Sequence, residues 1–175
     1  MNRRVGWASD LVHTFTIVVD MSSTLWFPWS RFASSSPSLA AELRGLFEQY
    51  GAGFGYLATV RRDGGPRVHP VSPVIADGGL FCFILSSPKR RDLERDGRYA
   101  LHSYPAETTD DEAYLAGRAR PVDDPDRRER VARLHRAAPD IDWRLFEFAI
   151  DVAVVTHRDD FQAEPWHRMW HAPIS

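Results

Sequence analysis

Six apolar runs, separated by turn residues or by helical segments, follow one another along the chain after residue 50. They are rich in Val, Leu, Ile, Phe and Tyr, which favour strands. Asp63-Gly64-Gly65 and Asp77-Gly78-Gly79 lie between the first three runs and are typical of hairpin turns. We therefore predict strands, antiparallel where short turns join them, at 53–60, 66–75, 79–86, 98–104, 112–122 and 145–156.

Three segments between or before these runs have a helical pattern. They cover residues 34–51, 87–97 and 124–139, and each opens with a capping residue followed by proline. These pairs are Ser36-Pro37, Ser87-Pro88 and Asp124-Pro125. The predicted fold class is mainly β with flanking helices. Closing the six-stranded sheet into a barrel would remove its edges.

Composition narrows the function classes. A chain of 175 residues suits one domain, and its net charge of −2 provides no basic field to attract nucleic acid or an anionic membrane. Cys82 is the single cysteine, which excludes an intrachain disulfide and fits a reducing, cytoplasmic location. We expect neither nucleic acid nor a membrane as partner.

The first 28 residues do not follow the pattern of the rest. Arg3 and Arg4 precede the short apolar stretch TFTIVV, but Asp10, His13 and Asp20 limit the apolar region and no clear cleavage site follows. We interpret residues 1–28 as a poorly ordered leader or a mis-annotated start, with Met1 or Met21 as the true first residue. Residues 29–175 then form a single domain.

The stretch SSPKRRDL contains Lys89, the only lysine in the chain. A helix predicted to begin at Pro88 would carry Lys89, Arg90 and Arg91 in its first turn, where cations are unfavourable. A phosphate bound to the free amides of the helix start would relieve this conflict. Alternatively, Arg90 and Arg91 pair with Glu94 and Arg95 pairs with Asp92 on a solvated surface.

Arg67 opens the second apolar run. Pro66, Pro70 and Pro73 lack a backbone N–H, so we expect this run to be irregular or to lie at a sheet edge. We also expect it to pair by a hairpin with the strand at 79–86, which would bring the guanidinium of Arg67 to the same anion. The alternative is an arginine at the rim with no ligand.

The segment 53–105 resembles the core of the pyridoxamine 5′-phosphate oxidase-like split barrels. The motifs that carry the resemblance are an LATV-type strand, an Asp-Gly turn, R-V-x-P-V at 67–71 and S-x-K-x-x-x-L at 87–93. The resemblance extends from about residue 29 to 156. It implies a six-stranded antiparallel split β-barrel, dimeric, with flavin mononucleotide (FMN) or the deazaflavin coenzyme bound between two subunits.

Carried over to this chain, the resemblance implies that Arg67 and Lys89 bind the cofactor phosphate. Ser86 and Ser87 would donate hydroxyl hydrogen bonds to it. The next strand residues would run along the edge of the flavin ring and donate backbone hydrogen bonds. These residues are Val68, His69, Pro70, Val71 and Ser72.

The chain also departs from the oxidase pattern. Ser72 and Pro88 stand where the oxidases usually have lysine and arginine, Cys82-Phe83 replaces a Tyr-Thr pair, and no Arg-x-His motif lies near the C-terminus. We therefore do not expect vitamin B6 oxidation. We expect a flavin- or deazaflavin-dependent oxidoreductase that moves a hydride to or from a small organic substrate. The alternative is a non-catalytic flavin or haem binder, and no catalytic residue is assigned.

For several other side chains we favour structural roles over the chemical roles that their types would allow. His69 could tune the flavin ring or donate a proton, and His102 could ligate haem. His167 and His171 are four apart and could hold a metal if the tail were helical. Trp166 and Trp170 could cover the cofactor. The arginine-rich segment 124–139 is offset by acidic residues and favours a solvated helix over nucleic-acid binding.

Overall fold

The computed structural model describes residues 26–173 except 108, 136, 138–140 and 159–163. Most of residues 1–28, the predicted leader, therefore lie outside the described residues, and the predicted division of the chain stays a prediction. The helices are α1 (Trp29–Ser35), α2 (Pro37–Glu48), α3 (Pro88–Arg95) and α4 (Pro125–His135). The strands are β1 (Gly55–Val60), β2 (Pro66–Val71), β3 (Val74–Ala76), β4 (Gly79–Leu85), β5 (Arg98–Ser103), β6 (Glu112–Pro121), β7 (Trp143–His157) and β8 (Trp166–His171).

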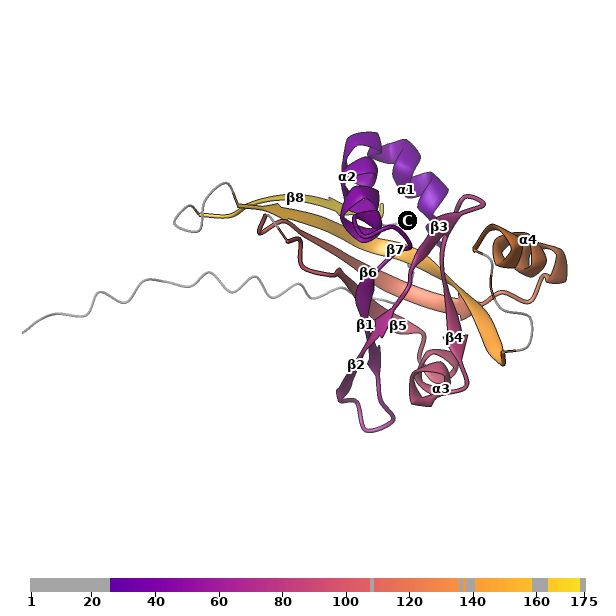
Figure 1. Cartoon of the computed structure of the whole chain (residues 1–175). Helices are drawn as coiled ribbons and strands as arrows, with labels where there is room; N and C mark the ends of the chain where they lie inside the picture. Colours follow the sequence, from indigo (N-terminus) through magenta and orange to yellow (C-terminus); the bar gives the residue numbers. More distant parts are fainter. Residues whose placement is uncertain (1–25, 108, 136, 138–140, 159–163, 174–175) are drawn as a thin grey trace, which may run out of the picture.

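The strands form one antiparallel sheet in the order β2-β1-β5-β6-β7-β4-β3, with β8 added to β7. The sheet curls into a half-barrel whose two end strands, β2 and β3, follow each other directly in the chain (Figure 1). This confirms the mainly β, split-barrel prediction. The strand count of six was too low, because the run at 66–75 breaks at Ser72-Pro73 into β2 and β3 and the C-terminal tail adds β8.

Strand β2 lies at one edge of the sheet, as its prolines predicted. The expected hairpin between this strand and β4 is wrong: β2 pairs with β1, and β3 pairs with β4. The reason is the position of the break. Because the chain turns at Ser72-Pro73, the Asp77-Gly78 turn joins only the short strand β3 to β4, and the outer edge of β2 is left without a strand partner among the described residues.

The long strand β7 organises the barrel wall. Its residues pair with β6 on one side, and on the other side with β4 near its start and β8 near its end. Between those two partners the amide of Ile150 donates to the Phe27 carbonyl at 2.9 Å, and the Ala172 amide donates to the Asp151 carbonyl at 2.8 Å. The segments at Phe27 and at Ala172, near the two ends of the described chain, thus both bond to the side of β7 that also carries β4 and β8.

The two faces of the sheet differ. Leu57, Leu101 and Leu115 line the inner face and are fully buried in the main core. On the outer face, register places Val68, Ala58, Ala100, Ala116 and Val152 in one row across five strands. The next row is Pro70, Tyr56, His102, Tyr114 and Val154. We call these two rows the outer sheet face; apart from His102 they contain only uncharged side chains.

The helices cover the ends of the half-barrel. In Figure 1, α1 and α2 lie together on one side of β7, and α3 lies on the other side, near the ends of β1 and β4. Helix α4 is held to the barrel by Arg127, whose guanidinium lies 2.8 Å from the buried carboxylate of Glu147. None of the helices in the described ranges is long and apolar enough to cross a membrane.

Candidate functional site

The start of α3 reaches the edge strand β2 through the side chain of Lys89. Lys89 Nζ donates to the carbonyl oxygen of Pro70 in β2 at 3.3 Å. Lys89 is half-buried, and this burial lowers its pKa. Register places Arg67 and His69 opposite the inward-facing Thr59 and Leu57. The structure therefore brings Arg67, His69 and Lys89 to one region, as the resemblance implied, although by a different strand pairing.

Arg67 is anchored by an acidic residue that sequence reasoning did not connect to it. Its Nε donates to Asp92 Oδ2 at 2.7 Å, and Thr59 Oγ1 and Arg95 also donate to this carboxylate, at 3.2 Å each. Burial raises the pKa of Asp92, but these hydrogen bonds outweigh it and leave the pKa below its ordinary value of 3.8. Asp92 is therefore ionised at neutral pH and fixes the direction of Arg67.

His69 is two residues from Arg67 on β2 and next to Pro70, whose carbonyl Lys89 contacts. Its pKa is lowered by burial and by the positive charges of Lys89 and Arg67, so the imidazole is neutral at pH 7. Its Nε2 is buried and has no hydrogen-bond partner among the described residues. Buried polar atoms are normally paired, so an unpartnered one next to two cations indicates a place where a ligand atom can bind.

The other predicted site residues have contacts or positions of their own. Ser87 occupies the cap position of α3, yet its hydroxyl donates to the Leu85 carbonyl at 2.9 Å and caps no helix amide. The backbone amide of Ser86 donates to the backbone carbonyl of Asp142 at 3.3 Å. Val68 and Pro70 belong to the outer sheet face, whereas Val71 is buried and Ser72 is exposed just beyond β2.

The predicted pairing is found for two of the three helix arginines, although Asp92, the partner of Arg95, is buried and not on a solvated surface. Arg90 lies 3.4 Å from Glu94 and 3.0 Å from Asp142, and Arg95 lies 3.2 Å from Asp92. Arg91 has no ion pair or hydrogen bond from its side chain within the described part of the chain. The positive charge at the start of α3 is thus only partly compensated.

Cys82 lies near Lys89 inside the barrel. It is completely buried, and burial raises the pKa of its thiol to about 12 although Lys89 acts in the opposite direction. The neutral thiol packs in the core and is not a nucleophile at physiological pH.

The histidines in the tail do not form a metal site. Residues 166–171 form strand β8, not a helix, and His167 and His171 are about 13 Å apart along it. His167 contacts Thr156 at 3.0 Å, and His171 contacts Met169 at 3.0 Å. Within the described ranges, no group of three His, Cys, Asp or Glu side chains could hold a metal ion.

The remaining candidates have structural contacts. His102 Nδ1 lies 2.8 Å from the carbonyl of Ser103, and its Nε2 lies 3.7 Å from Glu112. Trp170 packs against Phe27 and Phe32, with ring centroids 5.1 and 4.9 Å apart, which favours packing over a role as cofactor cover. Trp166 stacks on His157 at 4.4 Å.

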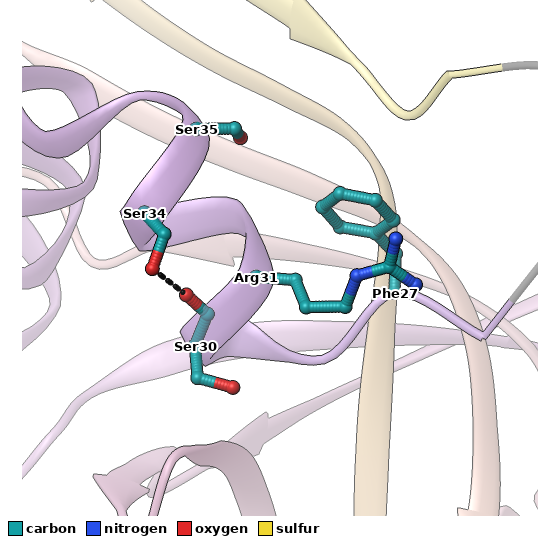
Figure 2. A pocket seen from close by; sticks show the side chains of 5 residues that line it. All are labelled: Phe27, Ser30, Arg31, Ser34 and Ser35. Carbon is teal, nitrogen blue, oxygen red and sulfur yellow. Dashed lines mark hydrogen bonds between the residues drawn. The ribbon is translucent and has the colours of Figure 1, made fainter.

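A separate hollow beside α1 lacks converging polar groups. Figure 2 shows its five lining residues, with the Arg31 guanidinium lying over the Phe27 ring at 4.4 Å. The Ser34 hydroxyl turns back to the Ser30 carbonyl at 2.9 Å. This hollow offers no acid, base or anion cradle, so the region between β2 and α3 is the candidate site.

Comparison with solved structures agrees with this fold. A general stress protein 26-related protein of the pyridoxinephosphate oxidase family from Clostridium acetobutylicum has a TM-score of 0.55 at 12% identity, over 81% of this chain and 95% of that one. A NimC/NimA family protein from the same organism has a TM-score of 0.55 at 18% identity, over 77% and 93%. HutZ, the haem storage protein from Vibrio cholerae, has a TM-score of 0.52 at 20% identity, over 66% and 89%.

At these identities the structural similarity shows the fold alone. No curated protein matches the sequence significantly. The sequence does match the pyridoxamine 5′-phosphate oxidase family model, and the match covers residues 39–156, which include β1 to β6 and almost all of β7. The chain belongs to the pyridoxamine 5′-phosphate oxidase-like family.

Proposed function

We propose that the protein is a flavin-dependent oxidoreductase that binds FMN, or alternatively the deazaflavin coenzyme, between β2 and the start of α3. The observation that carries this proposal is the buried, unpartnered Nε2 of His69, which lies on the same strand face as Arg67 and beside Pro70, the residue that Lys89 contacts. Two cations around a neutral donor or acceptor suit a phosphate group. The bound ring would carry the hydride, while the protein binds and orients it and the small organic substrate.

The edge position of β2 supports the same proposal. A strand with one unpaired edge has backbone groups free for a ligand, and the residues from Val68 to Ser72 follow that edge past Lys89. The apolar outer sheet face supports a homodimer, since a solvated sheet face is normally polar. A reducing, cytoplasmic setting, suggested by the single Cys82, is part of the proposal.

A cofactor titration tests the proposal. Purified cofactor-free protein is titrated with FMN and with the deazaflavin coenzyme, and the fluorescence of its six tryptophans is followed. Lys89→Ala should weaken binding of the preferred cofactor by about tenfold or more, because it removes a charge-assisted contact. The matched control is Arg128→Ala, which removes an exposed charge from α4. Equal affinity of Lys89→Ala and the control would refute the phosphate assignment.

Turnover separates the enzyme from a non-catalytic carrier. A bound cofactor that is reduced and then reoxidised by an organic acceptor supports the enzyme, and one that never passes on its electrons supports a carrier. The similarity to HutZ makes haem the second candidate ligand. Haem binding that is lost in His102→Ala would favour it, since His102 is the histidine proposed to supply an axial ligand.

A further inference from the structure

The outer side of α3 and the adjacent end of β2 form a pocket of about 450 Å³. Four arginines line it: Arg62, Arg67, Arg91 and Arg95. Pro88 and Asp92 complete the lining. The helix residues at 88, 91, 92 and 95 follow the spacing of one helix face, so the pocket is a direct result of the sequence of α3. Lys89 is not among the lining residues and instead contacts β2.

The charges in this pocket are not balanced. Asp92 is the only carboxylate in the lining, and it is already shared between Arg67 and Arg95. Arg62 and Arg91 have no side-chain partner within the described ranges, and Arg67 uses only its Nε. Four guanidiniums around one carboxylate leave a net charge of three positive units, which repel one another until an anion enters.

This surplus exceeds what one phosphate between Arg67 and Lys89 requires. Arginine forks bind phosphate and carboxylate oxygens in pairs, so three guanidiniums with free N–H groups suit two or more adjacent anionic groups. A second hollow, lined by Arg61, Arg62, Asp63 and Arg67, shares two of the arginines and continues the basic surface along the β1–β2 turn. Arg90, which is not among the residues that line this pocket, is by contrast paired with Glu94 and Asp142.

We infer that Arg62 and Arg91, with the terminal nitrogens of Arg67, form a second anion subsite, which binds a polyanionic group of a small molecule, such as a pyrophosphate or neighbouring carboxylates. This subsite rests on the proposed function only in sharing Arg67 with the cofactor phosphate site. The polyanion comes from one of two sources: a second anionic group of the cofactor itself, or a separate anionic substrate.

The test uses inorganic pyrophosphate and orthophosphate, titrated calorimetrically into the full-length, cofactor-free protein. Pyrophosphate should bind at least about tenfold more tightly than orthophosphate. Arg62→Gln and Arg91→Gln should each weaken pyrophosphate binding by about tenfold, because each removes charge-assisted hydrogen bonds. Arg128→Gln is the control, since it removes the same charge from the surface of α4. Arg62 and Arg91 are exposed and unpaired, so their replacement should leave the fold intact.

Pyrophosphate binding in Arg62→Gln and Arg91→Gln that equals binding in Arg128→Gln overturns the inference. So does equal affinity for pyrophosphate and orthophosphate. Binding of FMN, which has one phosphate, should stay within about twofold in both variants, whereas Lys89→Ala should reduce it. If neither FMN nor the deazaflavin coenzyme binds but pyrophosphate binds as expected, the proposed function fails and the subsite stands.

A parallel titration with flavin adenine dinucleotide identifies the source. Weaker binding of this dinucleotide in Arg62→Gln and Arg91→Gln supports the subsite and assigns the second anion to the cofactor. Unchanged dinucleotide binding, combined with weaker pyrophosphate binding, supports the subsite and assigns it to a separate anionic substrate.

Discussion

Asp92 determines how the cations of the candidate site are arranged. Its carboxylate is almost fully buried and accepts hydrogen bonds from Thr59, Arg67 and Arg95. It ties β1, β2 and α3 together and fixes the guanidinium of Arg67 at the start of β2. Losing it would leave two arginines and a hydroxyl without their acceptor, and removing one partner of a buried charge pair is costly.

Asp92→Asn should lower the free energy of unfolding by about 2–3 kcal/mol. This is below the ~3–5 kcal/mol typical of fully buried pairs, because the side chains of Arg67 and Arg95 are 30% and 37% exposed. Urea unfolding monitored by tryptophan fluorescence measures the change. The control, Asp123→Asn, removes a carboxylate that is 87% exposed and 3.5 Å from Arg144, and it should change stability by less than about 0.5 kcal/mol. Equal stability of the two variants would contradict this role for Asp92.

The same residue should shape the acid limb of the stability curve. Its pKa is lower in the folded protein than in the unfolded chain, so the unfolded state binds more protons as the pH falls. The stability from Asp92 is therefore present above the ordinary value of 3.8 and is lost as the pH falls through the folded pKa. The wild type should lose more stability than Asp92→Asn from about pH 5 downward. If the free energies of unfolding of the wild type and of Asp92→Asn fall in parallel below about pH 5, the prediction is contradicted.

At the scale of elements, α3 and α4 provide a matched pair of helix starts. Asp124 Oδ1 accepts from the amides of Asp126 and Arg127 at 3.0 and 3.2 Å, so it caps α4 as predicted. Ser87 caps no amide of α3. Asp124→Ala should therefore cost about 1 kcal/mol, and Ser87→Ala less than about 0.5 kcal/mol, in urea unfolding. A larger loss for Ser87→Ala than for Asp124→Ala would show that these cap assignments are wrong.

The elements that were predicted correctly have local signals. Helices α2, α3 and α4 each begin at a proline, and the turns at Gly64 and Gly78 adopt positive φ angles of 84° and 71°. Strand β8 was missed because its sequence, WHRMWH, becomes a strand only by pairing with β7. Helix α1 has no acidic residue in its first turn and no capping side chain, so nothing local marked its start.

The candidate site, too, was predictable from the sequence only where its contacts are local. Pairs within α3, such as Arg95 with Asp92, were predictable from helical spacing. The Arg67–Asp92 pair joins residues 25 positions apart and depends on how α3 packs against β1 and β2. The arginine pocket depends on the same packing, since Arg62 comes from the turn after β1 and Arg91 from the helix.

At the scale of the whole molecule, the outer sheet face is the largest unexplained feature of the monomer. Its two rows cross five strands and combine small residues with aromatic rings. Val68 is 59% exposed and Tyr56 is 37% exposed, although both are apolar enough to favour burial. A second copy of the chain placed on this face would bury it and would cover the adjacent edge of β2, where the cofactor is proposed to bind.

Val68→Glu should therefore dissociate the proposed dimer. A carboxylate buried in an apolar interface has no partner there, so the dimer dissociation constant should rise at least about tenfold. Leu134→Glu is the matched control, because Leu134 is an equally apolar residue on α4 that is 66% exposed and far from the outer sheet face. Sedimentation velocity of the cofactor-free proteins over a concentration series measures the change, so any effect on cofactor binding does not enter. A dimer that persists in Val68→Glu, or that dissociates equally in Leu134→Glu, would place the interface elsewhere.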